Sequence, residues 1–229
     1  MKVFIGYDHR EDVAVSVARS SLERTSGLHA DLLRADRLHA LGLLTRPTDY
    51  RGQDYDLHSN APASTRFAIS RFLVPIICQQ GWALFTDCDM VFLRDVRELL
   101  SLVDGRHAVY VVKHQHDPVE TEKMLGLVQT RYPRKNWSSV MLFNCDHPAN
   151  QRLSLWDVNH RPGRDLHAFY WLADDEIGEL PPEWNWLVGV QPKPEAPAIA
   201  HFTLGGPWFP AWPGAEHDDI WWEAAVRGP

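Results

Sequence analysis

The sequence predicts an α/β fold in which a Rossmann-like, mostly parallel sheet is flanked by helices. The first reason is the order of periodic segments, which runs strand, helix, strand, helix, strand over the early part of the chain. The second is size, because 229 residues, 45% of them hydrophobic, are enough to bury one large core. No shift in composition marks a domain boundary, so residues 1–229 are expected to form a single domain.

Each expected element rests on a local pattern. Residues 2–7 are typical of a strand, and residues 10–25 of a helix that Gly27 is suited to cap. Apolar residues at helical spacing predict a helix over 64–80, with a kink at Pro75. Further strands are expected at 31–35, 83–87, 107–113, 140–144 and 199–202, and further helices at 96–102, 119–130, 149–156 and 217–226.

Residues 42–63 contain Gly, Pro, Asn and Asp instead of a periodic apolar pattern, which predicts a long loop. Loops of this length in compact domains are usually functional or disordered, and a mobile lid or loop beside the ligand is expected here.

Composition narrows the classes of partner and setting. A net charge of −7 argues against nucleic acid. No segment reaches the length of a membrane span, and the first eight residues turn acidic too soon for a signal peptide. Three cysteines without close pairing argue against a disulfide framework or a zinc site, and favour a reducing, cytoplasmic setting.

Two carboxylates separated by one residue are the strongest chemical signal. An apolar run at 83–85 leads into Asp87-Cys88-Asp89, and a second run at 90–93 follows directly. Residues at i and i+2 of an extended backbone point to the same side, and two like charges so close are costly without a cation. Carboxylate oxygens suit Mg²⁺ or Mn²⁺, which in turn bind phosphates. A metal site that grips a phosphorylated ligand is expected; the simpler alternative is a strand end with two solvated acids.

Three further segments accompany this motif: Val3–Asp8, Arg71–Pro75 and His201–Trp208. With Asp87–Asp89, they resemble the GT-A-fold glycosyltransferases of family eight, the glycogenin-like and bacterial galactosyltransferase-like enzymes. The resemblance covers most of the chain and implies a single GT-A domain. It implies a metal-dependent transfer of a hexose, with retention, from a nucleoside-diphosphate sugar (UDP-sugar favoured) to a hydroxyl acceptor on a glycan, lipid or protein.

The resemblance also implies a metal site. Asp87, Asp89 and His201 would hold the divalent ion, and a mixed carboxylate and imidazole set is tolerated better by Mn²⁺ than by Mg²⁺. Gly205 and Gly206 would let the backbone approach the diphosphate. The alternative for His201 is a buried histidine that is hydrogen-bonded to the backbone.

Other positions are implied to bind the nucleotide. Tyr7 would stack on the base and Asp8 would accept a hydrogen bond from it, whereas Arg71, with Arg66 as a second candidate, would reach the diphosphate. The alternatives are a turn residue for Asp8 and a helix-surface charge for Arg71. Ser138-Ser139 stands where relatives line the sugar pocket. Trp184-Asn185-Trp186 is an acceptor-binding aromatic pair or, preferably, packing.

The chain departs from the family pattern at two places. Gly206 stands where relatives often carry a lysine before Pro-Trp. The family's mid-chain Asp-Gln-Asp is here 173–176, Ala-Asp-Asp-Glu, which makes Asp174 and Asp175 the candidate catalytic residues. A carboxylate at Asp174 would face the anomeric carbon or activate an acceptor hydroxyl, and the second role would give inversion. A solvated acidic turn is the alternative.

Two rival functions remain open at this point. The segment 84–91 also resembles the nucleophile strand of haloacid-dehalogenase-like phosphatases, although that motif usually opens their domain and here lies about eighty residues along the chain. A non-catalytic nucleotide- or sugar-binding protein on the same fold is the second rival.

Overall fold

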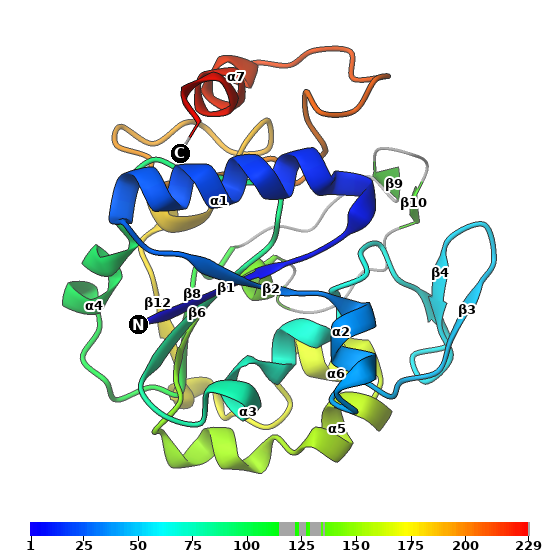
Figure 1. The fold of residues 1–229 in the computed structure, drawn as a ribbon. Helices are drawn as coiled ribbons and strands as arrows, with labels where there is room; N and C mark the ends of the chain where they lie inside the picture. The colour runs from blue at the N-terminus through cyan, green and yellow to red at the C-terminus, as the bar shows by residue number, and fades with distance from the viewer. Residues whose placement is uncertain (115–121, 124–126, 129–133, 135, 229) are drawn as a thin grey trace.

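A six-stranded sheet forms the centre of the protein in the computed structural model (Figure 1). The structure describes residues 1–114, 122–123, 127–128, 134 and 136–228. The spatial order of the strands is β12 (Ile177–Glu179), β8 (Val109–Val111), β11 (Val140–Asn144), β6 (Trp82–Thr86), β1 (Lys2–Gly6) and β2 (Ala30–Leu33). β11 is antiparallel to both of its neighbours, and the other five strands run in one direction. The predicted mostly parallel sheet is confirmed.

Helices cover both faces of this sheet, as Figure 1 shows. On one face lies α1 (Asp12–Ser26), which ends at Gly27 with a φ of +67° and a cap bond from the Gly27 N–H to the Glu23 carbonyl. On the other lie α3 (Val74–Cys78), α5 (Leu155–His160) and α6 (Gly163–His167). Because the central strands are covered on both sides, β6 and β11 are almost continuously apolar and buried.

A second sheet extends the fold beyond β6. It contains β7 (Met90–Phe92), β14 (Ile199–His201) and β13 (Trp186–Leu187), and it packs against α1 and the closing helix α7 (Asp218–Arg227). β14 is antiparallel to β7, and the register sets His201 opposite Met90. The last residue of β14 therefore lies beside the turn that follows β6.

The predicted loop at 42–63 is wrong, because this segment forms a small antiparallel sheet of β3 (Thr48–Tyr50), β4 (Asp54–Asp56) and β5 (Ala61–Pro62). Its anchor is a buried ion pair in which Arg46 lies 2.6 Å from Asp56. The same guanidinium donates to the carbonyl of Val158 at the core of α5. An ion pair between residues ten apart leaves no trace in apolar periodicity, which explains why the sequence pattern missed it.

Other boundaries also differ from prediction. The helix expected at 64–80 is shorter: it consists of a 3-10 turn, Ser70–Leu73, followed by α3. Pro75 does not kink α3, because it lies in the first turn, where the backbone N–H has no partner within the helix. In the helix expected at 119–130, Glu122–Lys123 (β9) and Leu127–Val128 (β10) pair as strands, and the rest lies outside the described residues. The helix expected at 149–156 is instead a 3-10 turn, Pro148–Arg152, followed by α5.

Some elements were not predicted at all. The helix α2 (Ala35–Ala40) begins where strand 31–35 was expected to end, and β12, β13 and α6 carry too few periodic residues to reveal themselves. The helix expected at 96–102 is present as the 3-10 turn Val96–Glu98 and α4 (Leu99–Leu102).

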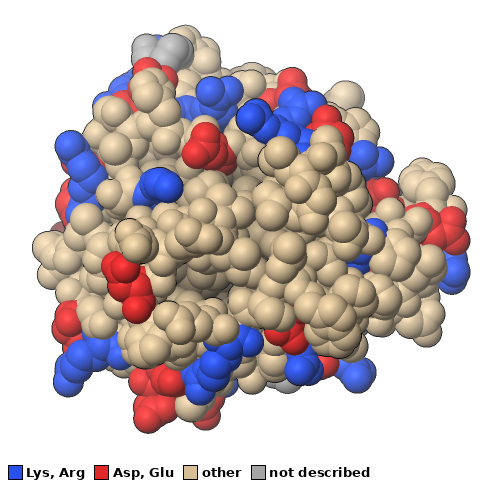
Figure 2. Space-filling view, turned by 60° about the horizontal axis from the view of Figure 1, so that its bottom comes forward, with Lys and Arg blue, Asp and Glu red and all other residues tan. Residues whose placement is uncertain are grey.

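The lower face of the protein is turned forward in Figure 2. Uncharged side chains fill most of its middle, and acidic and basic side chains lie chiefly toward its margin. None of the helices in the described part of the chain has the length and apolarity that crossing a membrane requires. Cys78, Cys88 and Cys145 are buried free thiols.

Candidate metal and nucleotide site

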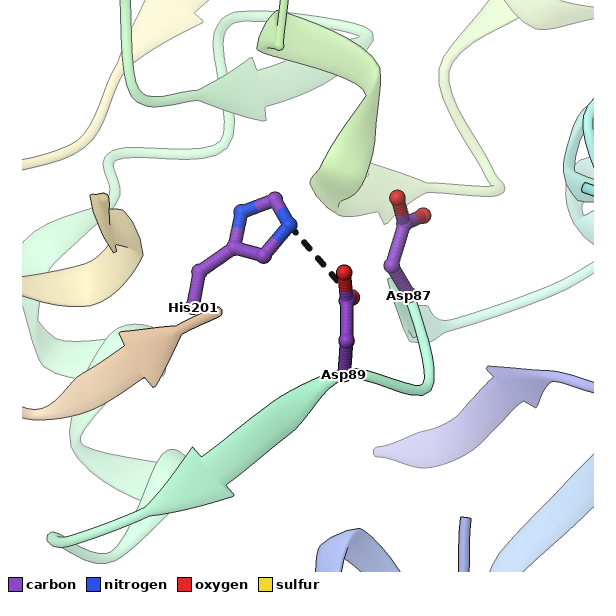
Figure 3. Close-up of side chains that lie close together, drawn as sticks. All are labelled: Asp87, Asp89 and His201. Carbon is purple, nitrogen blue, oxygen red and sulfur yellow. Dashed lines mark ion pairs between the residues drawn. The ribbon is translucent and has the colours of Figure 1, made fainter. Parts of the chain in front are cut away.

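Three side chains expected to hold a metal lie together at the carboxyl end of β6 (Figure 3). Asp87 follows β6 directly and Asp89 precedes β7, and their carboxylates point to the same side of the intervening turn. His201 approaches from β14, with its Nε2 3.4 Å from Oδ1 of Asp89. One ligand atom from each residue lies within 4.8 Å of the others. Two carboxylate oxygens and one imidazole nitrogen fit a divalent cation of the Mn²⁺ or Mg²⁺ kind.

Asn185 fixes the imidazole of His201. Its Oδ1 lies 2.9 Å from Nδ1 of His201, and its Nδ2 donates to Oγ of Ser139 at 2.9 Å. Because the amide nitrogen already donates to Ser139, the amide oxygen faces the ring and accepts a hydrogen bond from the Nδ1–H of His201. The Nε2 lone pair then points toward the carboxylates, which is the tautomer a metal ligand needs. The alternative in which His201 is hydrogen-bonded to the backbone is therefore wrong, because its Nδ1 bonds the side chain of Asn185.

Sequence reasoning missed Asn185, although it considered the flanking tryptophans. Trp184 and Trp186 are 0% and 1% exposed, which confirms the preference for packing. A fully buried amide between two core tryptophans must find hydrogen-bond partners. An asparagine between two tryptophans was therefore the only sequence feature that pointed to a structural role for Asn185.

Arg71 lies against Asp87, with 2.8 Å between Nη1 and Oδ1. The same Nη1 donates to the carbonyl of Ser138 at 2.8 Å, and the rings of Phe67 and Phe85 lie 5.3 and 5.1 Å from the guanidinium carbon. At 5% exposure this is no helix-surface charge, so that alternative is wrong. The carboxylate–guanidinium pair fixes the Arg71 guanidinium at the edge of the metal cluster.

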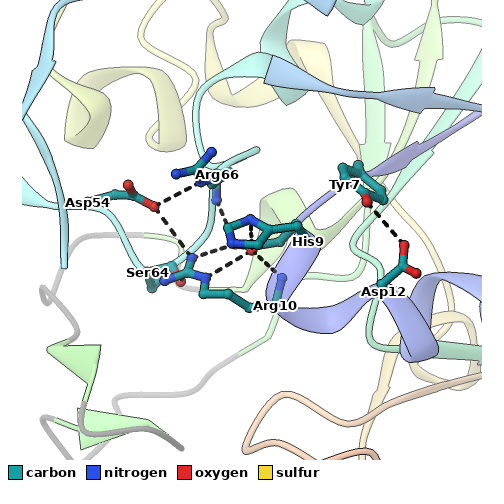
Figure 4. A network of polar contacts seen from close by, with 8 residues as sticks. Tyr7, His9, Arg10, Asp12, Asp54, Ser64 and Arg66 are labelled. Atoms are coloured by element: carbon teal, nitrogen blue, oxygen red, sulfur yellow. Dashed lines mark hydrogen bonds and ion pairs between the residues drawn. The ribbon is translucent and has the colours of Figure 1, made fainter. Parts of the chain in front are cut away.

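Asp8 is fully buried and caps the 3-10 turn His9–Glu11, which precedes α1. Its partners Arg10 and Arg66 are shown in Figure 4. Its oxygens accept hydrogen bonds from the backbone N–H and guanidinium of Arg10 and from the backbone N–H of Arg66. Burial by itself would raise the pKa of Asp8, but the hydrogen bonds and charge of Arg10 outweigh it and hold the pKa below its usual value. This arrangement agrees with the turn-residue interpretation of Asp8.

The other two positions expected near the nucleotide have partners of their own. Tyr7 donates its hydroxyl to Asp12, and the Arg34 guanidinium lies 4.5 Å from the ring centroid. Arg66 extends to Asp54 of β4, with 3.4 Å between its Nε and the carboxylate (Figure 4). Arg66 thus connects the small sheet to the main body.

Gly205, Gly206 and the acidic turn at 173–176 are not part of the metal cluster of Asp87, Asp89 and His201. A Cβ at Gly206 would lie 2.3 Å from the ring of Trp208, and Gly205 has a φ of +109°. Asp174 pairs with Arg134 but its side chain is 93% exposed, and Asp175 is exposed on the same turn. This turn precedes the amino end of β12, whereas Asp87 follows the carboxyl end of β6. The catalytic role of Asp174 and Asp175 stays a prediction.

A cavity of about 300 Å³ opens beside Asp87. Its walls come from residues 59–65, from α6 and from the turn before β11, which contributes Ser138 and Ser139. Sequence reasoning missed α6 and its His167, because a five-residue helix gives almost no periodic signal.

Comparison with known proteins identifies a relative of the whole chain. The chain matches no family model. Protein CDI of Arabidopsis thaliana is 44% identical over 229 residues, covering 96% of this chain and 84% of that protein. The chain belongs to the Protein CDI family. The name Protein CDI specifies no reaction.

Solved structures resemble the chain in fold. The glycosyltransferase GlyE of Streptococcus pneumoniae TIGR4 aligns with a TM-score of 0.61 at 15% identity over 98% of this chain. The bifunctional glycosyltransferase WbbM gives 0.60 at 15% identity over all of it. This chain spans 60% of the GlyE chain and half of the WbbM chain. The galactosyltransferase LgtC, in complex with donor and acceptor sugar analogs, gives 0.56 at 15% identity and is covered over 96% of its length. The fold is that of GT-A-like glycosyltransferases.

Replacing Asp8 with Asn should destabilise the protein by roughly 3 kcal/mol at pH 7, because Arg10 loses its buried counter-ion. The folded pKa of Asp8 lies below the unfolded value, about 3.9, so its ionised form stabilises the fold above about pH 4. That contribution disappears as pH falls through the folded pKa, so the difference between the two proteins should narrow in acid. Urea unfolding at pH 7 and pH 3 measures it, with Asp31→Asn, an exposed change on β2, as a control that changes little. A difference that is unchanged at pH 3 would contradict this account.

Replacing Asn185 with Ala should weaken Mn²⁺ binding by about 10- to 100-fold, because His201 loses the partner that fixes its tautomer. Titration calorimetry with Mn²⁺ provides the measurement. Asn150→Ala is the matched control, since Asn150 is also buried but bonds the carbonyls of Ala108 and Asn144. Equal Mn²⁺ affinity in Asn185→Ala and the native protein, or an equal loss in the control, would refute the role of Asn185.

Proposed function

We propose that this protein is a metal-dependent glycosyltransferase of the family-eight kind. It moves a hexose from a nucleoside-diphosphate sugar, UDP-sugar favoured, to a hydroxyl acceptor on a glycan, lipid or protein. The observation that carries the proposal is the cluster of Asp87, Asp89 and His201 at the carboxyl end of a central strand. In open α/β sheets this is the edge at which ligands bind.

The residues divide the work by charge. When bound, a divalent ion, Mn²⁺ or Mg²⁺, supplies neutralisation of the charge that develops on the leaving diphosphate. Asp87 and Asp89 offer oxygens to that ion, and His201 offers Nε2. Arg71 adds a fixed guanidinium beside Asp87, which suits it to a phosphate oxygen.

The nucleoside is proposed to lie where β1 ends. Tyr7 and Asp8 follow β1, whose carboxyl end is next to that of β6 in the sheet, so base and diphosphate sites adjoin. Arg66, Gly205 and Gly206 are the remaining proposed contacts of the nucleotide.

Three kinds of finding support the proposal. The fold is shared with proteins named as glycosyltransferases, and LgtC is named as a galactosyltransferase bound to donor and acceptor sugar analogs. The donor set suits the proposed ion. The buried free thiols agree with a reducing, cytoplasmic setting, which remains part of the proposal.

The rival functions separate by simple assays. Release of phosphate from a phosphomonoester would favour the phosphatase, and the glycosyltransferase-like fold argues against it. A non-catalytic binder would bind nucleotide sugars with metal but would neither hydrolyse nor transfer the sugar.

Replacing Asp89 with Ala should abolish Mn²⁺-dependent binding of UDP while leaving the fold intact, because one of the oxygen ligands is lost. Thermal shift with UDP, in Mn²⁺ and in EDTA, reports this directly, since a ligand of the native state raises its apparent stability. Asp31→Ala, an exposed change on β2, is the control that should behave like the native protein. If Asp89→Ala binds UDP in Mn²⁺ as tightly as the native protein, the site is misplaced.

The transfer should retain configuration, so that an α-linked donor gives an α-linked product. Retention needs no strong base on the acceptor face, because the leaving diphosphate can take the acceptor proton. An exposed Asp174 paired with Arg134 supports this outcome. Asp174→Asn should then cost less than tenfold in rate, whereas loss of a general base costs about 100- to 10,000-fold. Proton NMR of the first-formed glycoside decides, and a β-linked product would refute retention and promote Asp174 to general base.

A further inference from the structure

The cavity beside Asp87 contains a buried imidazole that sequence reasoning did not anticipate. His167, the last residue of α6, lines this cavity together with Ser138. Its Nδ1 lies 2.7 Å from Oγ of Ser138, and its ring meets Phe72 edge-on at 5.1 Å. Both His167 and Ser138 are buried, at 9% and 2% exposure. The imidazole is therefore held in one orientation against the serine hydroxyl.

Residue 138 also connects this pair to the metal cluster. The carbonyl of Ser138 accepts a hydrogen bond from Nη1 of Arg71, and the same Nη1 lies 2.8 Å from Asp87. The backbone of Ser138 is thus fixed relative to Asp87, and its side chain is fixed by His167. Together they determine where a hydroxyl stands in the cavity relative to the metal ligands.

The helix that carries His167 is itself tightly held. The Gly163 N–H donates to Oγ of Ser59 at 2.7 Å, and Ser59 bonds Asp56 in turn. A Cβ at Gly163 would lie 3.0 Å from Ser59 and from Ile69, so the start of α6 packs directly on the opposite wall. Both walls of the cavity therefore keep their spacing, as positioning of a ligand requires.

The size and place of the cavity indicate what it takes. At about 300 Å³ it is at the lower end of ligand pockets, roughly 300–1,000 Å³, and suits one sugar ring better than a whole nucleotide sugar. Asp87 forms part of its wall, so the cavity adjoins the proposed diphosphate site. In a nucleotide sugar the glycosyl group is bonded directly to the distal phosphate.

We propose that His167, acting through the hydroxyl of Ser138, positions the glycosyl group of the nucleotide sugar in this cavity; this rests on the proposed function. A serine hydroxyl has one donor and two acceptor sites. The bond to Nδ1 uses one of them and orients the rest toward a sugar hydroxyl. His167 is thereby a positioning residue, which acts on the sugar through Ser138.

The test compares the affinities for UDP-glucose, UDP-galactose and UDP in Mn²⁺, measured by calorimetry. The quantity of interest is the ratio of the Kd for the UDP-sugar to the Kd for UDP, taken for the sugar that the native protein binds more tightly. His167→Ala and Ser138→Ala should each raise this ratio about fivefold, the effect of one lost hydrogen bond, and leave the Kd for UDP within twofold. His167→Asn, whose amide reaches the place of Nδ1, should restore the native ratio.

The outcomes separate the two proposals. If the native protein binds neither UDP nor the UDP-sugars, the proposed function fails. If it binds them and His167→Ala leaves the ratio unchanged, or weakens UDP and UDP-sugar equally, the role of His167 is overturned. His29→Ala, with a 75% exposed side chain, controls for loss of a histidine. Ser138→Ala keeps the test decisive if His167→Ala does not fold.

Discussion

The electrostatic repulsion between Asp87 and Asp89 is the constraint around which the site is built. Two like charges within 4.8 Å repel by roughly 3 kcal/mol at an effective dielectric constant of 20. The fold compensates Asp87 with the guanidinium of Arg71, whereas Asp89 faces Nε2 of the neutral His201 imidazole at 3.4 Å. Arg71 and His201 are both buried and each is held by a second partner, the Ser138 carbonyl for Arg71 and the Asn185 amide for His201. The remaining repulsion is what a cation bound between the carboxylates would relieve.

The two sheets bring these groups together from distant parts of the chain. The parallel order of β1 and β6 sets Asp8 and Asp87 at the same sheet edge, and the antiparallel register of β7 and β14 delivers His201 to the turn between β6 and β7. The turn before β11 then supplies Ser138 and Ser139, one to Arg71 and the other to Asn185. A shift of one residue in β14 would move His201 to the other face of its strand, because side chains alternate along a strand. The site therefore depends on register more than on any one element.

How much of this was predictable follows from the range of each interaction. The Asp87–Asp89 motif and the cap at Gly27 are local patterns that can be recognised in the sequence, and the alternation of strands and helices predicts a mostly parallel sheet without its strand order. Asn185 was not predictable as a partner of His201, because sixteen residues and a strand register separate them. The ion pair of Arg46 and Asp56 anchors the small sheet within 42–63. It could not be predicted from apolar periodicity, because it joins two polar residues ten positions apart. His167 was missed because it lies on α6, a five-residue helix that gives almost no periodic signal, although α6 lines the cavity.

The missing lysine before Pro207-Trp208 has a steric explanation that agrees with the position of Arg71. Gly206 has no room for a side chain, because its Cβ would lie 2.3 Å from the Trp208 ring. Trp208 cannot easily move aside, since it packs on Trp221 of α7 at 5.6 Å between ring centroids. Position 206 therefore cannot supply the positive charge that the proposed diphosphate site would need, and Arg71, buried against Asp87, is the proposed source of it. A cation bound by Asp87 would take over part of the charge that Arg71 now compensates, which leaves the guanidinium donors better able to bind a phosphate oxygen.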